Sequence, residues 1–569
     1  MLAIAWFAWV AQQVYSDLSD VQTDARALAE AIGEGDVERA HALLEDFQES
    51  SNGAADSTDS ITWSIIERVP FYGDDARALA TVSDVLSGLG EEGVRPLVDS
   101  AEKVSAGAYA PQAGQFPLAG IAALEAPATQ SHEAFRRAAD ELAEHDSGNF
   151  VDAVAQPFDG LRAQVDAAGA ALETAARASR LMPAFLGADG DRNYLYVFQN
   201  NAEVRSTGGL PGNISLVNAS DGRVRIARQA SGAQLGEYPR PVLPLTDDEV
   251  SVYGRQLGTY FLDANFTPDF PRASDLWRAR WQAEFDEDID GVFSVDPVTL
   301  SYLLAATGPV TVDGVELDTT NVVRVVENLV YINVPDPLKQ DEFLNAVAKK
   351  VFDTFASGAG DPVQIIQALY RGVAEGRVRI HSFTEADQEQ ITGTEIAGEL
   401  PVEGDRRPHI GVYLNDATGS KMSYYLQYAV DVASVSCTDD GQQELLGRLE
   451  IASKTPPDPE LLPESVTGFD AVRDPFIQHG QQFVVGDIFM PIDGEVTSVH
   501  VDGEALDPPV IDRLHGREMV SVAFLLEPRE THVVTWEMTS GPNQDGDTVV
   551  SVTPGVLPRT ESSMATSAC

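Results

Sequence analysis

The N-terminal third of the chain carries a helical pattern of apolar positions. Apolar side chains recur at spacings of three and four, as at Leu28 and Ile32, in sequence rich in Ala, Leu, Glu and Asp. A polar run at residues 49–60 and a Gly/Pro-rich run at residues 107–117 interrupt this pattern. We therefore expect an all-α stalk or bundle of helical hairpins over residues 18–190.

The pattern changes at Asn193, where strands and helices begin to alternate. A buried-strand run at residues 194–198 precedes a hairpin with an Asp-Gly turn at residues 214–227. Three helical segments then alternate with two strand-like segments, namely residues 273–285, 291–295, 298–306, 310–312 and 341–356. This alternation predicts a layered α/β domain over residues 191–385.

The last part of the chain has a period of two. A charged, Pro-containing stretch at residues 386–408 is interpreted as a linker. Seven alternating or apolar runs follow it, at residues 409–414, 422–436, 445–452, 481–490, 496–501, 519–526 and 532–538. Seven strands at this spacing predict an all-β sandwich over residues 409–556, followed by a tail at residues 557–569.

The first residues are apolar through Ala11, and no Lys or Arg precedes Arg26. A membrane-spanning helix needs about 20 apolar residues, so we interpret residues 1–17 as a partial transmembrane anchor that begins upstream. A buried first helix is the alternative. The expected fold class is therefore multidomain, with a membrane anchor, an all-α stalk, an α/β domain and a β-sandwich. The protein would be a single-pass protein of the cell membrane, with the bulk of the chain extracytoplasmic.

Charge limits the classes of partner. The chain has 89 Asp and Glu residues against 38 Lys and Arg residues, and its net charge is -51. Such a field repels the phosphates of nucleic acid, so we expect no nucleic-acid partner. Lysine is scarce and occurs only at positions 103, 339, 349, 350, 421 and 454.

The chain has two cysteines, Cys437 and Cys569. Two thiols cannot form a disulfide-rich scaffold or a four-thiolate zinc site. Cys437 ends a predicted strand, and Cys569 would be an exposed, oxidisable thiol if it were free. We predict a disulfide between them, with two unrelated thiols as the alternative.

One polar run stands at the end of the first predicted strand of the α/β domain. It reads Gln-Asn-Asn-Ala-Glu-Val-Arg-Ser-Thr-Gly-Gly over residues 199–209. Ligands bind at strand ends in open α/β sheets, and an arginine beside a glycine turn suits a phosphate or pyrophosphate. The candidate ligand-binding residues are Asn200, Asn201, Thr207, Gly208 and Gly209, around Arg205. An ordinary polar turn is the alternative.

A second run, residues 263–271, contains Asp263 and Asp269 in a proline-stiffened loop. Two carboxylates at this spacing suit a hard cation such as Mg²⁺. The alternative is a solvated loop that caps a helix. No other cofactor is indicated.

The runs at residues 199–209, 263–271 and 290–310 resemble the uncharacterised domain of unknown function 4012 family. That family is found in membrane-anchored bacterial proteins. The helical region and the terminal sandwich are similar to it as well, so the resemblance covers nearly the whole chain. The family has no established activity, and the resemblance therefore implies a fold without a reaction.

The central domain also resembles, more distantly, the LytR-CpsA-Psr family, which transfers lipid-pyrophosphate-linked glycopolymers onto the bacterial wall. This resemblance implies that Arg205 and Arg228 hold a pyrophosphate in one cavity, and that Lys339 lies nearby. The acids of that family are replaced here by the amides Asn200 or Asn201, by Thr207-Gly208 and by Gln229. Its Mg²⁺ ligands are therefore missing unless Glu203, Asp263 or Asp269 replaces them.

Three functions follow from these patterns. The first is a cell-envelope phosphotransferase that acts on a polyprenyl-pyrophosphate-linked glycopolymer, with Arg205, Arg228 and Glu203 as catalytic residues. The second is a non-catalytic protein of the same fold that binds a polyprenyl phosphate or a cell-wall glycan. The third is a structural scaffold built from the helical region and the sandwich.

Overall fold

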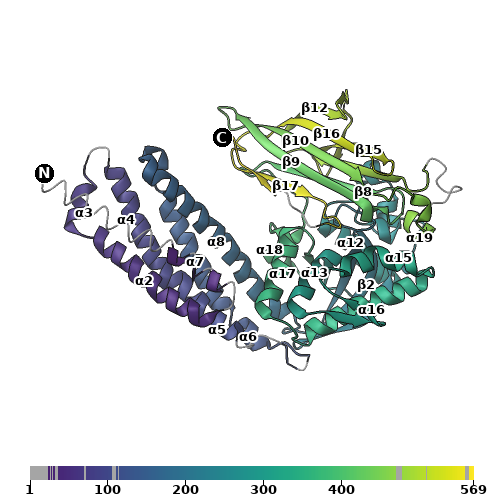
Figure 1. The fold of residues 1–569 in the computed structure, drawn as a ribbon, viewed down its shortest axis with the longest axis horizontal. Helices are drawn as coiled ribbons and strands as arrows, with labels where there is room; N and C mark the ends of the chain where they lie inside the picture. Colours follow the sequence, from purple (N-terminus) through teal and green to yellow (C-terminus); the bar gives the residue numbers. More distant parts are fainter. Residues whose placement is uncertain are drawn as a thin grey trace. The chain divides into compact units, whose positions relative to one another are not determined.

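The computed structural model describes residues 23–569, apart from residues 26, 29, 33–35, 70–71, 106–110, 113, 469–476, 508 and 558–562. The chain divides into two compact units. The first ends at Asp191 and also includes Ala219–Arg223, and the second contains the rest of the chain. Figure 1 labels many of the elements of both units.

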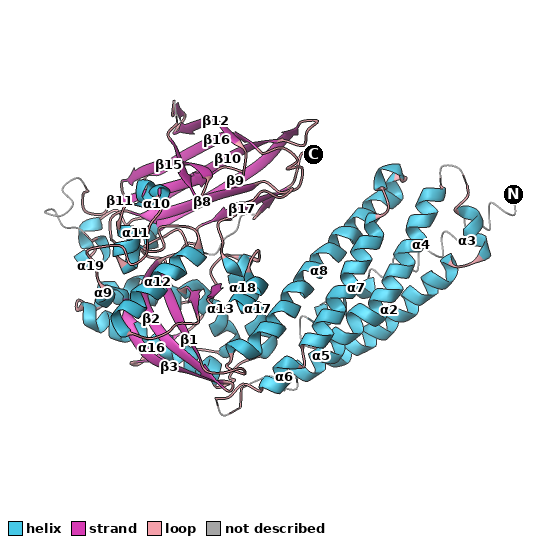
Figure 2. Cartoon of the chain, turned by 180° about the vertical axis from the view of Figure 1, so that it is seen from behind, coloured by secondary structure: helices cyan, strands magenta, loops and turns pink. Residues whose placement is uncertain are grey.

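The first unit is helical (Figure 2). Its helices include α2 (Val37–Thr58), α3 (Ile61–Ile66), α4 (Gly73–Gly88), η1 (Leu89–Val94), α5 (Arg95–Ser105), α6 (Leu118–Ala122), α7 (Glu125–Ala143), η2 (Ser147–Asn149) and α8 (Asp152–Phe185). Phe47, Val82, Leu142 and Val165 pack in its main core. Because these side chains come from α2, α4, α7 and α8, the apolar stripes of the helices face one another.

The membrane assignment is corrected by the structure. In the part of the chain that the structure describes, no helix combines the length and the apolar character that a membrane crossing requires. The 34-residue α8, for example, contains charged residues such as Asp166 and Arg177. The predicted anchor over residues 1–17 lies outside the described residues. The structure therefore does not support a membrane anchor, the membrane as a partner or a single-pass location.

The α/β part of the second unit is built on one mixed sheet. The strand order is β3-β2-β1-β4-β7, with bounds β1 (Arg192–Asn200), β2 (Leu210–Ser220), β3 (Arg223–Ser231), β4 (Gly291–Val295) and β7 (Arg379–Ser382). Strands β1 and β4 are parallel, and β7 pairs with β4 in the antiparallel sense. Asp221 and Gly222 turn the β2–β3 hairpin with positive φ angles of 47° and 76°, as their Asp-Gly pair predicts.

Both faces of β1 are buried. Leu195 and Val197 pack with Trp277 of α12 (Phe270–Phe285), whereas Phe198 packs with Leu304 of α13 (Pro297–Thr307). Burial on both faces explains why the strand reads as a continuous apolar run. The other helical elements are α9 (Gly232–Leu235), α10 (Asp247–Tyr253), α11 (Gln256–Thr259), η3 (Phe261–Asp263), α14 (Val322–Arg324), η4 (Val325–Leu329), α15 (Val330–Asn333), α16 (Pro337–Ala356), α17 (Pro362–Ala374), α18 (Glu385–Ile391) and η5 (Glu395–Ala397).

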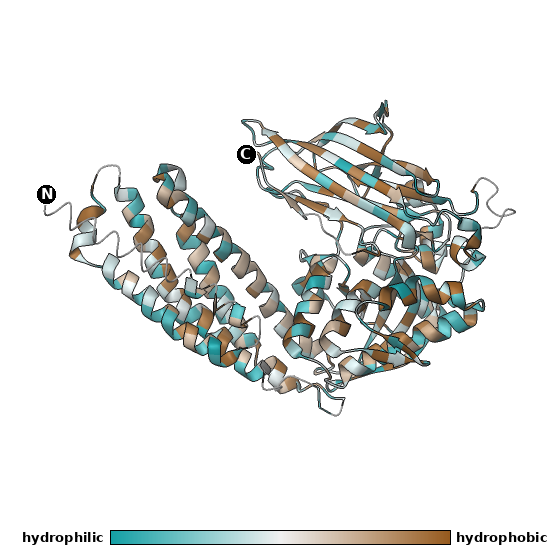
Figure 3. Cartoon of the chain, in the orientation of Figure 1, coloured by the Kyte–Doolittle hydropathy of each residue, from teal (hydrophilic) through white to brown (hydrophobic). Residues whose placement is uncertain are grey.

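The C-terminal part is a sandwich of two sheets. One has the order β13-β12-β16-β10-β9 and the other has the order β14-β15-β11-β8-β17-β18. The bounds are β8 (His409–Asp416), β9 (Leu426–Cys437), β10 (Gln443–Ser453), β11 (Gln482–Phe489), β12 (Glu495–Val501), β13 (Glu504–Ala505), β14 (Ile511–Leu514), β15 (Arg517–Leu526), β16 (Thr531–Thr539), β17 (Thr548–Val552) and β18 (Met564–Ala565). Apolar and polar residues alternate along these strands (Figure 3), because one face of each strand lines the core.

The sandwich and the α/β part share their cores. Tyr413 and Phe489 of the sandwich belong to the same buried cluster as Trp277 of α12. In the opposite direction, Val204 from the polar run is 1% exposed and belongs to the sandwich core. This continuous apolar packing agrees with the grouping of both parts in one compact unit.

Several local elements differ from the sequence predictions. Residues 386–408 are not an open linker, because α18 and η5 form there and Ile391 and Leu400 are buried. The predicted strand at residues 422–436 begins instead as a 3-10 turn, η6 (Met422–Tyr425), before β9. The strand at residues 310–312 is β5 (Val310–Val312), which pairs only with β6 (Val315–Leu317), outside the main sheet. Short apolar runs alone cannot decide between such outcomes.

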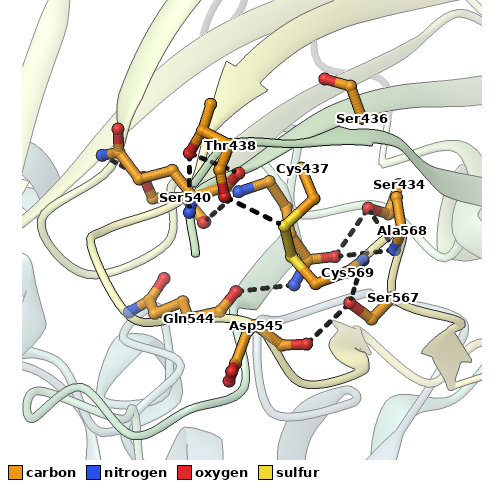
Figure 4. The surroundings of a disulfide bond; sticks show 12 residues. Ser434, Ser436, Cys437, Thr438, Ser540, Gln544, Asp545, Ser567, Ala568 and Cys569 are labelled. Carbon is orange, nitrogen blue, oxygen red and sulfur yellow. Dashed lines mark hydrogen bonds between the residues drawn. A yellow bond between two sulfur atoms is a disulfide. The ribbon is translucent and has the colours of Figure 1, made fainter. Parts of the chain in front are cut away.

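The C-terminal tail is attached to the sandwich. Cys437 at the end of β9 forms a disulfide with Cys569, and their Cα atoms are 5.1 Å apart. Ala568 donates its backbone N–H to Ser434 at 3.1 Å, and the hydroxyl of Ser567 donates to the carbonyl of Asp545 at 2.7 Å (Figure 4). Since β9 and β18 lie in different sheets, the bond links the two sheets at this side of the sandwich.

We predict that Cys569→Ser lowers the free energy of unfolding by roughly 2 to 5 kcal/mol. The bond joins residues 132 positions apart, and a long closed loop restricts the unfolded chain strongly. Denaturant titration without reductant measures the loss. Cys437→Ser should give the same value, and reductant should destabilise the wild type without changing either variant. Equal stability of all three proteins would contradict the prediction.

We also predict that salt stabilises the protein. A net charge of -51 makes the folded chain repel itself, and raising KCl from about 0.1 M to about 1 M shortens the screening length from about 10 Å to about 3 Å. The melting temperature should rise over this range. A melting temperature that is constant or falls with KCl would show that the surplus carboxylates do not destabilise the fold.

Candidate functional site

The polar run at residues 199–209 turns sharply where β1 ends. The N–H of Gly208 donates to the carbonyl of Arg205 at 2.7 Å, and the N–H of Leu210 donates to the carbonyl of Glu203 at 2.9 Å. A Cβ at Gly209 would lie 2.3 Å from the carbonyl carbon of Asn200. The turn therefore requires glycine at position 209 because the backbone approaches too closely for a side chain.

The hydroxyl and backbone donors of this turn bind within the protein. The side-chain oxygen of Gln199 accepts from the Thr207 hydroxyl at 2.7 Å and from the Gly209 N–H at 3.1 Å. Asn265 donates to the same oxygen at 3.2 Å and also to Thr207 and to the carbonyl of Gly209. These groups, predicted to cradle a phosphate, already have partners in the interior.

The two asparagines of the run also have internal partners. The side-chain amide of Asn200 donates to the Tyr331 hydroxyl at 2.7 Å. The amide of Asn201 donates to the carbonyls of Gly208 at 3.3 Å and Pro554 at 3.4 Å. Pro554 lies beyond the last residue of β17, so Asn201 links the α/β part to the sandwich.

Arg205 is buried, with a side chain that is 5% exposed. One terminal nitrogen donates to the carbonyls of Val204 at 3.0 Å and Asp416 at 3.2 Å. The other lies 3.6 Å from a carboxylate oxygen of Asp263, and the guanidinium lies over the ring of Phe266 at 4.9 Å. These contacts fix the cation inside the protein instead of presenting it to a ligand.

Glu203 is also buried and forms an ion pair with Lys421. The Lys421 ammonium lies 2.6 Å from its carboxylate and 4.6 Å from the ring centroid of Tyr331. Lys421 belongs to the connection between β8 and η6 of the sandwich, whereas Glu203 follows β1 of the α/β part. The pair therefore crosses between the two parts.

Three further hydrogen bonds join residues 201–206, which we call the joint segment, to the sandwich. Asp416 donates its N–H to the carbonyl of Val204 at 2.9 Å, and Ser423 donates its N–H to the carbonyl of Ala202 at 3.0 Å. Ser206 donates its N–H to the side-chain oxygen of Asn415 at 3.0 Å. The joint segment thus lies between the two parts and binds both.

From the α/β side, Glu327 holds the start of the joint segment. Its carboxyl oxygens accept from the N–H groups of Asn201 at 3.2 Å and Ala202 at 2.5 Å. Glu327 lies in η4 and is 1% exposed. Burial raises the pKa of Glu327 to about 8, although the N–H of Ala202 opposes the shift.

Two other buried carboxyl groups, both near Arg205, have raised pKa values. Burial raises the pKa of Asp263 to about 6, against the opposing effect of Arg205. Burial likewise raises the pKa of Asp416 to about 6, again opposed by Arg205. The carboxylate of Glu203 adds to the upward shift of both pKa values, because like charges disfavour ionisation.

The predicted arginine clamp is not assembled. Arg228 lies on β3, is 45% exposed and pairs with Glu287 at 3.0 Å. It also lies over the ring of Phe285. Among the contacts of the described residues, Arg228 shares no partner with Arg205. Lys339 is exposed in the first turn of α16. Among the contacts of the described residues, it has none with Arg205 or Arg228.

The predicted Mg²⁺ pair is not assembled either. Asp263 faces Arg205, whereas Asp269 precedes α12 and accepts from the N–H of Leu400 at 3.1 Å. A cation in contact with Asp263 would have to displace a guanidinium. Among the described residues, no group of three or more His, Cys, Asp or Glu side chains is arranged to hold a metal ion. The donor set present here therefore does not fit Mg²⁺.

The sequence reasoning missed Glu327, Lys421, Asn415 and Asp416 as members of this site. A signal existed for two of them. Glu327 is the one acidic residue in the apolar stretch 325–332, and Lys421 is one of six lysines in a chain that otherwise uses arginine. Isolated charges in such settings need a partner when they are buried, but the sequence does not identify that partner.

A separate cavity of about 280 Å³ lies where the sandwich meets the α/β part. Strand β9 forms one wall with Tyr428, and residues 552–557 form another. Arg377 and Glu375 of the α/β part also line it, together with Lys454 after β10. The Arg377 guanidinium is bound by Asp296 and Glu375, each at 2.6 Å, and by the carbonyls of residues 555 and 557.

Comparison with known proteins gives a family match over part of the chain. Residues 189–331 match the model of the family described as protein of unknown function (DUF4012). The matched stretch contains the whole polar run, Asp263 and Glu327. No curated protein matches the chain, and no solved structure matches it.

We predict that Lys421→Met lowers the free energy of unfolding by about 3 kcal/mol, because it leaves the Glu203 carboxylate buried without a cation. Denaturant titration of Lys421→Met, Glu203→Gln and the double variant measures the coupling. The double variant should recover most of the loss. Lys350→Met removes an exposed lysine of α16 and should change stability by at most about 0.5 kcal/mol. Strictly additive losses would contradict the pairing.

Proposed function

We propose that this protein is a non-catalytic binding protein for a glycan, and that the ligand site is the cavity between β9, residues 552–557 and the Glu375–Arg377 pair. The observation that carries the proposal is the cavity itself, about 280 Å³ in volume and lined by side chains of both parts. Ligand pockets have volumes of about 300 to 1,000 Å³. This cavity is at the lower end of that range, so it suits one or two sugar units of a longer glycan chain.

The charges in the cavity favour an uncharged ligand over a pyrophosphate. Arg377 has little to offer a ligand, because two carboxylates and two carbonyls bind four of its five N–H donors and its side chain is 1% exposed. Although burial opposes the effect, hydrogen bonds from Arg377 and Arg371 lower the pKa of Glu375, which is therefore ionised at neutral pH. The carboxylates of Glu375 and Glu450 would repel a phosphate.

Other lining groups suit a sugar. Lys454 is exposed at the cavity and forms no ion pair among the described residues, so its ammonium is free to donate. Gln427 adds an exposed amide on the outer face of β9. The ring of Tyr428 adds an apolar surface whose position is set by a hydrogen bond from its hydroxyl to the Thr553 carbonyl at 2.9 Å.

A glycopolymer transferase similar to the LytR-CpsA-Psr family is the other candidate, and the contacts of Arg205 count against it. A catalytic arginine must offer its fork to the reacting phosphate. Here that fork binds Asp263 and two backbone carbonyls. A scaffold role is favoured by one different observation, the disulfide that links the two sheets. Since disulfides persist in oxidising compartments, we also propose that the protein functions in an oxidising compartment.

We predict that neutral oligosaccharides of N-acetylated amino sugars bind the full chain, and that Lys454→Met and Gln427→Ala each weaken binding about five- to tenfold. The reason is the loss of one hydrogen bond to a ligand hydroxyl or carbonyl, which is worth roughly 1 to 1.5 kcal/mol. Isothermal titration calorimetry measures the affinity. Lys350→Met is the matched control, and it should bind as the wild type does.

The same preparation separates the three functions. Incubation with Mg²⁺ and a short-chain polyprenyl-pyrophosphate-linked glycan should release no polyprenyl phosphate. Release that disappears in Arg205→Ala would overturn the proposal in favour of the transferase. Absence of both binding and release would overturn it in favour of the scaffold. Binding that Lys454→Met leaves unchanged would show that the cavity is not the site.

A further inference from the structure

Residues 563–569, which we call the strap, lie across one side of the sandwich. Strand β18 of the strap pairs with β17 in the antiparallel sense and is the last strand of its sheet. Strand β9 is the last strand of the other sheet and contacts β17. The strap reaches β9 through the Cys437–Cys569 bond and through the N–H of Ala568, which donates to Ser434 at 3.1 Å (Figure 4). The strap therefore covers the side of the sandwich where β9 and β17 meet.

Little apolar burial holds the strap in place. Among the strap residues, all of which the structure describes, Ala565 is buried at 9% exposed, whereas Met564 is 44% exposed. Ser567 donates its N–H to Asp547 at 2.8 Å and its hydroxyl to the carbonyl of Asp545 at 2.7 Å. Each such hydrogen bond adds little net stability, and the cost of ordering the backbone opposes it. The disulfide is therefore the contact that keeps the strap closed.

The disulfide is accessible in the folded protein. Cys437 and Cys569 are both exposed. Thiol–disulfide exchange requires a thiolate to reach one of the two sulfur atoms, so access limits its rate. A reductant can therefore attack this bond without unfolding of the sandwich, which a buried disulfide would require.

We propose that the strap is a redox-released cover over the side of the sandwich between β9 and β17. In the opening step, a thiolate of a dithiol attacks one sulfur atom of the Cys437–Cys569 bond, and the second thiol of the dithiol resolves the mixed disulfide. The dithiol gives up two electrons and two protons and becomes a disulfide, while both cysteines become thiols. The strap then retains only its non-covalent contacts and leaves β17.

Release of the strap uncovers β17. In the closed state, the N–H of Val550 donates to the carbonyl of Ser563 at 2.8 Å, and release removes this partner. The side chain of Val550 is 3% exposed and belongs to the sandwich core. Strand β17 thus becomes a sheet edge that can pair with an extended segment. The inference concerns the strap alone and does not depend on the proposed glycan.

Hydrogen–deuterium exchange of the full chain, with and without dithiothreitol, tests this inference. Peptides with the N–H groups of Val550, Ser567 and Ala568 report on the strap, and peptides from the β10–β16 pairing report on the core. After reduction the strap groups should exchange at nearly the intrinsic rate, while the core stays protected about a thousandfold or more. Strap groups that stay protected after reduction, or a bond that dithiothreitol does not reduce in the folded protein, would overturn the proposal.

Two variants and a reversal locate the effect. Cys437→Ser should show the fast exchange of the reduced strap without reductant, and dithiothreitol should not change it. Thr566→Ala, at an exposed position of the strap, should respond as the wild type does. Oxidised glutathione, which accepts the two electrons from the thiols, should restore protection in the reduced wild type. A Cys437→Ser strap as protected as the oxidised wild type would refute the role of the bond. If that variant does not fold, the wild-type series of reduction and reoxidation decides the question.

Discussion

Residues 201–206 are the constraint on which the rest of the second unit depends. They leave β1 in a bend that glycine permits at position 209 and place Val204 in the core of the sandwich. A buried strand end exposes backbone groups that must find partners. The partners here come from both sides, with Glu327 on one side and Asp416 and Ser423 on the other. A single short segment therefore satisfies its own backbone by joining two layers.

The charges around this segment follow from the same constraint. Lys421 and Arg205 neutralise Glu203 and Asp263, respectively, in the interior. Glu327 has no cation among the described residues, and the backbone N–H groups of Asn201 and Ala202 are its partners instead. A chain with a net charge of -51 has few cations to use for this purpose. Its two parts therefore meet around a buried carboxyl group whose pKa is raised.

The predicted catalytic centre and the observed joint occupy the same residues. An arginine, several amides and a glycine turn at a strand end are the groups that bind a phosphate, but they also satisfy one another when a second domain covers them. The sandwich covers them here, through the side chain of Asn415 and the carbonyl of Asp416. A cavity open to solvent lies instead beside β9. That cavity is the proposed ligand site.

The amino-acid sequence alone determined the local elements. The 3.6-residue period at the N-terminus, the Asp-Gly hairpin and the alternating C-terminal strands all correspond to elements of the structure. The pairing of Cys437 with Cys569 could also be predicted, because the chain has two thiols. These features depend on periodicity, turn chemistry and cysteine count, which act along the chain or within a set of two.

Tertiary structure alone decided which charges meet. Glu203 pairs with Lys421, 218 positions away, and Arg205 reaches the carbonyl of Asp416, 211 positions away. Arg228 stays apart from Arg205 although both follow or lie on strands of one sheet. The sequence could not predict these outcomes, because a buried charge selects its partner by distance in space. That distance depends on how the sandwich packs over the α/β sheet.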